Sequence, residues 1–255
     1  MTRPAIPVAP TIETTSGFPR ALWATTQPSA RAAAIKRRLV ENAREIDVER
    51  ARFTTESYRA TEGQPMPVRR AKMLLHLVRS MSITIAPDEL IVGNRSLKPR
   101  MGIIAPEGAV NWIDKELEIL PTRPQDRFNI SAEQIRELRE EIFPWWRGHT
   151  LEDVVAQRVP PDVAHVVKGK AFSLNQTDHA QGHILPDVEG WLRLGIGGLR
   201  ADVESARHRP DVQTEKKQTF YAAAELVLQA ARELIERYAV LALALCASLE
   251  AAPKL

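Results

Sequence analysis

A long helical pattern near the carboxyl-terminal end constrains the fold of this chain more than any other feature of its sequence. It runs from residue 212 to about residue 249 without a glycine. With a rise of 1.5 Å per residue, such a helix is about 57 Å long, which exceeds the width of a compact domain of this size. We therefore expect the helix to lie against a larger body of protein.

Patterns typical of helices also occupy most of the remaining chain. Apolar residues recur at spacings of three and four, and several segments begin at a proline or a capping residue. Ser131 and Gln134 form a capping box, and Thr150 and Asp153 give a similar start signal. The predicted helices span residues 29–46, 48–63, 110–120, 131–145 and 187–208, with further helices starting at 67, 150 and 160.

Two segments favour extended structure. Leu90, Ile91 and Val92 end a stretch of β-forming residues from 83 to 92, and a tight turn at Gly93 follows. A second extended piece is expected at 101–104. Within the helix at 187–208, which should have Pro186 in its first turn, four glycines each cost up to about 1 kcal/mol relative to alanine. We expect close packing of another backbone to compensate.

The composition excludes several classes of protein. The 255 residues are 44% hydrophobic with a formal charge of +3, which indicates a globular protein without the basic surface of a nucleic-acid binder. A single cysteine, Cys246, rules out an internal disulfide and fits the cytoplasm. No signal peptide is evident, and the longest apolar run, 238–247, is about half of the roughly 20 residues of a membrane span. Residues 1–28 read as a flexible leader.

A polar stretch at 172–183 is the main candidate for a binding site. Six polar side chains follow a β-like start, which is typical of a strand entering a polar cavity and also of a solvated loop. His179 and His183 are four residues apart beside Asp178, a spacing that could hold a divalent metal on a helix. Ala180 replaces the glutamate of the helical zinc-protease pattern, and Gly182 argues against a helix, so a hydrogen-bonded pair is favoured over a metal site.

Three smaller features have structural interpretations that we prefer. The basic turn after Gly93, with Arg95, Lys98 and Arg100, could bind an anion, but a turn with solvated charges is favoured. Arg123, Asp126 and Arg127 indicate a structural salt-bridge network. The pair Trp145 and Trp146 is interpreted as a packing anchor.

Four separated motifs occur in an order that resembles a known family. They are Thr61-Glu-Gly-Gln-Pro-Met-Pro67, Leu90-Ile-Val-Gly-Asn-Arg95, Pro124-Gln-Asp-Arg-Phe128 and Asn175-Gln-Thr-Asp-His-Ala-Gln-Gly-His183. From about Ala30 to Tyr238 the chain resembles the amino-terminal part of the glycyl radical enzymes of the pyruvate formate-lyase type, closest to the dehydratase and lyase branch. The resemblance assigns residues 29–255 to an incomplete domain of this type.

The resemblance implies a fold and a chemistry. The full-length family has an α/β ten-stranded barrel with a helical shell, of which this chain would supply mainly α-helical shell and a first strand or two. A thiyl radical abstracts hydrogen from the substrate, and a neighbouring C–O, C–N or C–S bond breaks; formate acetyltransferase-like chemistry also occurs in the family. A separate activating enzyme installs the radical anaerobically, using S-adenosylmethionine and an iron-sulfur cluster, and this chain is expected to bind no cofactor directly.

The resemblance also implies which residues bind and which are missing. Side chains of the polar stretch would hold the substrate: Asn175, Gln176, Asp178, His179 and His183. Cys246 lies in an apolar helical context that predicts a buried, inert thiol, and it lacks the glutamate that follows the family's catalytic cysteine at two residues' distance. The last glycine is Gly198, so the radical glycine is also missing. The chain is therefore expected to contain no catalytic residue.

Two principal hypotheses of function follow. The first is the amino-terminal fragment of a glycyl radical lyase or dehydratase, inactive alone. Its partners would be the remainder of the enzyme, the activating enzyme and a small substrate, with a homodimer as a further option. The second is a non-enzymatic helical scaffold or interaction module derived from that family. Exposed apolar surface along the helix at 212–249 would favour the first hypothesis.

Overall fold

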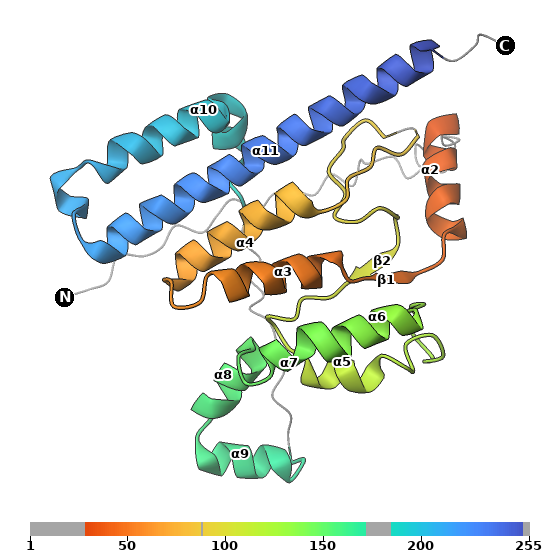
Figure 1. Cartoon of the computed structure of the whole chain (residues 1–255), viewed down its shortest axis with the longest axis vertical. Helices are drawn as coiled ribbons and strands as arrows, with labels where there is room; N and C mark the ends of the chain where they lie inside the picture. Colours follow the sequence, from red (N-terminus) through yellow and green to blue (C-terminus); the bar gives the residue numbers. More distant parts are fainter. Residues whose placement is uncertain (1–28, 88, 172–184, 252–255) are drawn as a thin grey trace, which may run out of the picture.

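The computed structural model describes residues 29–87, 89–171 and 185–251, and this part of the chain is mainly α-helical, as predicted (Figure 1). The predicted leader at 1–28 lies outside the described residues. The helices are α2 (Ala30–Glu41), α3 (Glu49–Ala60), α4 (Met66–Ser80), α5 (Asn111–Glu116), α6 (Ala132–Glu137), α7 (Phe143–Trp146), α8 (Leu151–Arg158), α9 (Pro161–Lys168), α10 (Val188–Arg207) and α11 (Glu215–Ala251). A π-helical turn, Leu138–Ile142, joins α6 to α7, and a 3-10 turn, Pro210–Val212, precedes α11.

Two short strands form the described sheet. β1 (Glu45–Asp47) pairs in parallel with β2 (Met101–Ile103), with Ile46 opposite Gly102. On its other edge, the backbone N–H of Ile46 donates to the Asn129 carbonyl at 2.9 Å. The extended piece predicted at 101–104 is thereby confirmed.

Two predictions about these segments are wrong. The helix predicted to reach Ile46 ends at Glu41, because Asn42 turns extended and its side-chain amide donates to the Arg38 carbonyl. Ile46 is then buried in β1 instead. The strand predicted at 83–92 is a loop in its described residues, where Leu90 and Ile91 are exposed and no β pairing is made. Its described β-forming side chains find no partner strand, although Ile83 and Ile85 are half-buried.

The main core lies where α3, α5 and the segment from α6 to α7 meet. Trp146 is 2% exposed there, and its indole N–H donates to the Thr55 hydroxyl at 2.8 Å. The ring of Trp145 stands edge-on to that of Trp146, with 4.7 Å between centroids. The predicted packing anchor is confirmed.

Local capping signals set the helix starts in this core. Ser131 caps α6 and Gln134 returns a hydrogen bond, while Thr150 and Asp153 do the same for α8. Both capping boxes satisfy backbone N–H groups that would otherwise lack a partner. The predicted helix at 131–145 is interrupted only by the π-helical turn.

A second layer consists of the long helix α11 lying beside α4 and α10 (Figure 1). Leu75 and Val78 of α4 pack against Ala230 of α11. Arg79 donates two hydrogen bonds of 2.6 Å to the carboxylate of Glu233 across the same contact. The predicted long helix is confirmed, with 37 residues.

The glycines of α10 do not serve the packing role that we predicted. The backbone N–H of Gly190 donates to the Asp187 carboxylate, which caps the helix, so Pro186 lies before the cap and not in the first turn. A β-carbon added at Gly198 would meet the Leu194 side chain of the same helix, and one at Gly197 would meet nothing within 4 Å. Gly195 has a φ of 60° and a ψ of 180°, so it kinks α10. At these described positions the nearest atoms to an added β-carbon are side chains of α10 or its cap, and no neighbouring backbone is among them.

Candidate functional site

The predicted substrate-binding residues lie outside the part of the chain that the structure describes. These are Asn175, Gln176, Asp178, His179 and His183, in the segment between α9 and α10. Their role and the metal alternative for the two histidines therefore stay predictions. Among the described residues, no three His, Cys, Asp or Glu side chains come together as metal ligands would.

A groove of about 760 Å³ beside β2 is the best candidate for a binding site among the described residues. It is lined by residues of β1, β2 and the turn after β2, and by residues of α3, α4, α5, α7 and α8. Apolar side chains dominate the lining, which is typical of ligand pockets. They include Tyr58, Met66, Met73, Trp112, Phe128, Leu151 and Val154.

One ion pair supplies fixed charge to this groove. The guanidinium of Arg50 binds both carboxylate oxygens of Glu107, one of them at 3.0 Å, and both side chains are about three quarters buried. Such a bidentate pair has a defined geometry, but its charges neutralise each other. Sequence reasoning missed the pair because its members are 57 residues apart and belong to no motif.

Tyr58 also lines this groove. Burial raises the pKa of Tyr58, and the negative charge of Glu107 acts in the same direction. The guanidinium of Arg69 lies 4.7 Å from the centre of the ring. A neutral phenol under these conditions can donate or accept a hydrogen bond but is unsuited to act as a base at neutral pH. The groove can therefore hold an apolar group with a polar end, whether from a ligand or from another segment of protein.

The basic turn and the Arg123 cluster make contacts within the fold, but Lys98 and Arg100 of the turn are paired and not solvated as we predicted. Lys98 binds the Glu45 carboxylate, and Arg100 donates to the carbonyls of Val40 and Asn42 at 3.1 and 3.2 Å. The Lys98 contact ties the loop before β2 to β1, and the Arg100 contacts tie it to the end of α2. In the other cluster, Arg123 binds the Glu116 carboxylate at 2.7 Å and the Asp126 carbonyl at 2.8 Å.

Cys246 differs from its prediction in one respect. It is a free thiol on α11, but it is exposed and not buried. The apolar residues around it in the sequence were correctly placed in a helix, yet the described part of the chain places no protein over them. Burial could not be inferred from the helical pattern alone, because it depends on what lies beside the helix.

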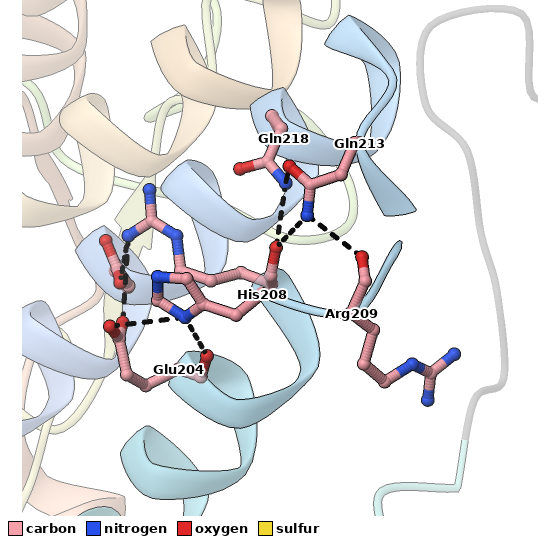
Figure 2. A network of polar contacts seen from close by, with 7 residues as sticks. Glu204, His208, Arg209, Gln213 and Gln218 are labelled. Atoms are coloured by element: carbon pink, nitrogen blue, oxygen red, sulfur yellow. Dashed lines mark hydrogen bonds and ion pairs between the residues drawn. The ribbon is translucent and has the colours of Figure 1, made fainter. Parts of the chain in front are cut away.

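A polar network fixes the turn between α10 and α11 (Figure 2). The carbonyl of Arg207 accepts hydrogen bonds from the side-chain amides of Gln213 and Gln218 at 3.0 and 2.9 Å. His208 contacts the Glu204 carbonyl through Nδ1 at 2.8 Å. The network satisfies the last carbonyls of α10 and sets the direction in which α11 leaves, so we interpret it as structural.

Comparisons with known proteins cover nearly the whole chain. The family model described as pyruvate formate lyase-like matches residues 22–255. The probable dehydratase YbiW of Escherichia coli (strain K12) is 34% identical over 201 residues, which are 77% of this chain and 25% of that protein. An isethionate sulfite-lyase of Nitratidesulfovibrio vulgaris is 31% identical over 79% of this chain and 26% of its own length.

Solved structures agree with these matches. The glycerol-bound B12-independent glycerol dehydratase of Clostridium butyricum superposes with a TM-score of 0.78 at 29% identity, over 84% of this chain and 28% of that one. A glycyl radical enzyme of Archaeoglobus fulgidus gives a TM-score of 0.76 at 33% identity, over 86% of this chain and 28% of that one. The chain thus spans about a quarter of the length of these relatives. It matches them in both sequence and fold, and it belongs to the pyruvate formate lyase-like family of glycyl radical enzymes.

Proposed function

We propose that the chain is the amino-terminal quarter of a glycyl radical lyase or dehydratase. The observation that carries this proposal is the family match over residues 22–255, combined with a span of only a quarter of each dehydratase and lyase relative. The mainly helical fold with one parallel strand pair agrees with a piece of the family's barrel and shell. The reaction would break a C–O, C–N or C–S bond next to a substrate radical.

In this proposal the polar stretch at 172–183 forms one wall of the substrate pocket. Asn175, Gln176, Asp178, His179 and His183 would bind the substrate's hydroxyl, amine or acid group, and one of them would take up or donate a proton. Amide, carboxylate and imidazole groups together offer both donors and acceptors for such a substrate. The assignment rests on the family resemblance of this motif.

In this proposal, residues outside these 255 carry out the radical chemistry. The 255 residues have no glycine after Gly198, and Cys246 is their only cysteine. Cys246 is exposed on α11 and lacks the glutamate of the family's cysteine motif. The chain by itself would be inactive, and its partners would be the rest of the enzyme and a cytoplasmic, anaerobic activating enzyme.

The test is to restore an enzyme from two parts. The 255-residue chain is produced anaerobically with an isethionate sulfite-lyase of Nitratidesulfovibrio vulgaris that lacks the quarter matched by this chain, together with that enzyme's activating enzyme. Electron paramagnetic resonance should detect a glycyl radical only when both parts are present. Release of sulfite from isethionate reports turnover.

Variants of the polar stretch separate the pocket assignment from assembly. Asp178→Asn and His179→Ala should leave the radical signal intact and reduce turnover by about a hundredfold or more, as expected for loss of an acid or base. Full turnover by both variants would refute the assigned roles. Turnover by the 255-residue chain alone, after activation, would refute the claim that it is inactive.

The exposed apolar side chains of α11 support the scaffold hypothesis less than the enzyme hypothesis. Phe220, Val227 and Ile235 are exposed and lie seven and eight residues apart, so they form a stripe on one side of the helix. A stand-alone scaffold would gain stability and solubility by covering or replacing such a stripe. The stripe favours a chain that packs against further protein.

A further inference from the structure

The groove beside β2 carries one positive charge that no described residue neutralises. Three arginines line the groove: Arg50, Arg70 and Arg123. Arg50 is paired with Glu107, and Arg123 is paired with Glu116. Arg70 has neither a hydrogen bond nor an acidic partner among the described residues. Its guanidinium is therefore available to an anion that enters the groove.

Helix α4 places Arg70 between two methionines. Met66, Arg70 and Met73 are four and three residues apart, so they lie on one face of the helix, and all three line the groove. Met66 is 52% exposed, whereas Met73 packs against the main core. Methionine side chains are unbranched and adapt to the shape of the apolar group that they cover. This face of α4 therefore offers a cation between two adaptable apolar surfaces.

The hydroxyl of Tyr58 is a second free polar group near Arg70. α3, which carries Tyr58, packs against α4 (Figure 1). Burial and Glu107 raise the pKa of Tyr58, and the positive charge of Arg70 opposes them, which requires the guanidinium to lie near the phenol. The Tyr58 hydroxyl has no hydrogen-bond partner among the described residues. Being neutral, it can donate to an oxygen that Arg70 also binds.

The rest of the groove has the size and lining of a small-molecule site. Its volume of about 760 Å³ lies within the range of roughly 300–1,000 Å³ that is typical of ligand pockets. The side chains of Trp112, Leu151 and Val154 line it and are exposed, so an apolar group can reach them. A few polar groups on a mainly apolar lining fix the orientation of a ligand. Arg70 and Tyr58 can serve this purpose here.

We propose that this groove binds a small organic acid, with its carboxylate held by Arg70 and the Tyr58 hydroxyl and its apolar body against Met66, Trp112 and Leu151. A cationic ligand is disfavoured because Arg70 would repel it. A neutral ligand would leave the charge of Arg70 without a partner. The site uses none of the residues assigned to the substrate at 172–183, so the inference does not depend on the proposed function.

Three probes with the same apolar body measure the preference for a carboxylate. They are 4-phenylbutanoate, 4-phenylbutanamide and 4-phenylbutylamine, each titrated into the 255-residue chain by isothermal titration calorimetry. The carboxylate should bind about tenfold more tightly than the amide, because only the carboxylate forms charge-assisted hydrogen bonds with Arg70. The amine should bind more weakly than the amide. Equal affinities, or no binding of any probe, would overturn the proposal.

Matched variants locate the bound probe. Arg70→Met keeps an apolar side chain on α4 and removes the charge, so it should weaken binding of the carboxylate about tenfold and leave the amide unaffected. Arg193→Met makes the same change at an exposed arginine of α10 and should have no effect. Ala105→Phe should block the groove and weaken both probes, because Ala105 lines the groove. All three positions are exposed, so these variants should fold.

Two further measurements separate this groove from the substrate pocket and from a protein interface. Asp178→Asn should leave binding of 4-phenylbutanoate unchanged, and loss of binding would place the probe in the substrate pocket and overturn a separate site. Binding should also persist in the enzyme assembled with the truncated isethionate sulfite-lyase, with the same loss in Arg70→Met. Displacement of the probe by the truncated lyase would show that protein fills the groove and would overturn the inference, whether or not the assembly turns over isethionate.

Discussion

The carboxylate of Glu233 joins α11 to α4 through a titratable contact. Hydrogen bonds from Arg79, and a further one of 2.9 Å from Gln229, lower the pKa of Glu233 from 4.5 to about 2. A carboxyl whose pKa is depressed by folding stabilises the fold above its unfolded pKa, and the stabilisation is lost as the pH falls from about 4.5 to about 2. Because the pair is solvent-exposed, the effect should be small.

Glu233→Gln should therefore lower the melting temperature of the chain modestly at pH 7. The difference from wild type should shrink between pH 4.5 and pH 2, because wild type then loses the same contact. Thermal unfolding followed by circular dichroism checks this. Arg79→Met should reproduce the behaviour, and a difference that persists unchanged to pH 2 would exclude the ion pair as its cause.

Substitution of Trp146 should destabilise the fold strongly, and the exposed Trp112 provides a matched control. Trp146→Phe removes the hydrogen bond to Thr55 and leaves a small cavity, at a cost of about 2–3 kcal/mol in the free energy of unfolding. Trp112 is 44% exposed, and Trp112→Phe should change stability by less than about 0.5 kcal/mol. Urea unfolding monitored by circular dichroism distinguishes the two, and equal costs would contradict the packing role.

The sequence predicted that Trp146 packs but not what it packs against. Thr55 is 91 residues away, and no local pattern links the two. The same limit explains Cys246, whose apolar neighbours indicated burial while the described chain leaves it exposed. The residues that form a helix are close together in the sequence, but the residues that bury one of its side chains can lie far away in the sequence.

Alanine substitutions at two glycines of α10, one of them at the kink, should have opposite effects on stability. Gly195 occupies a backbone region that is essentially restricted to glycine, whereas Gly197 has ordinary helical geometry and open space around it. Gly195→Ala should destabilise the chain by about 1–2 kcal/mol. Gly197→Ala should stabilise it by about 0.4–1 kcal/mol by restricting the unfolded chain. The two melting temperatures should shift in opposite directions, and a shared direction would contradict the kink.

Elements defined by local signals were predicted well, and elements defined by pairing were not. The capping boxes at Ser131 and Thr150 act within three residues, so the sequence alone located the starts of α6 and α8. β1 exists because Ile46 finds Gly102 and Asn129, which lie far along the chain. The segment at 83–92 has a stronger β composition but no such partner among the described residues.

The same difference between local signals and long-range pairing applies to the candidate site. The polar stretch from Asn175 to His183 was found as a motif, and its structure lies outside the described residues. The groove beside β2 could not be found from sequence, because it assembles side chains of five helices and two strands. Its Arg50 and Glu107 meet only after the chain has folded.

Buried apolar contacts are distributed unevenly over the molecule, and hydrogen exchange should reveal this. Thirteen buried side chains form the cluster around Trp146, whereas three form the cluster between α4 and α11. Amides exchange through local openings whose free energy follows such packing. In the isolated chain, amides of α3 and of residues 138–146 should exchange more than about tenfold more slowly than those of α10.

Mass spectrometry of exchanged peptides measures this ordering, and Trp146→Phe provides its control. If the two layers open separately, this variant should accelerate exchange in α3 and residues 138–146 and leave α10 unchanged. Equal protection of α3 and α10, with equal acceleration in the variant, would instead indicate a single cooperative unit. In that case the layer of α4, α10 and α11 would already be stable without the rest of the enzyme, and its exposed apolar stripe would need another explanation.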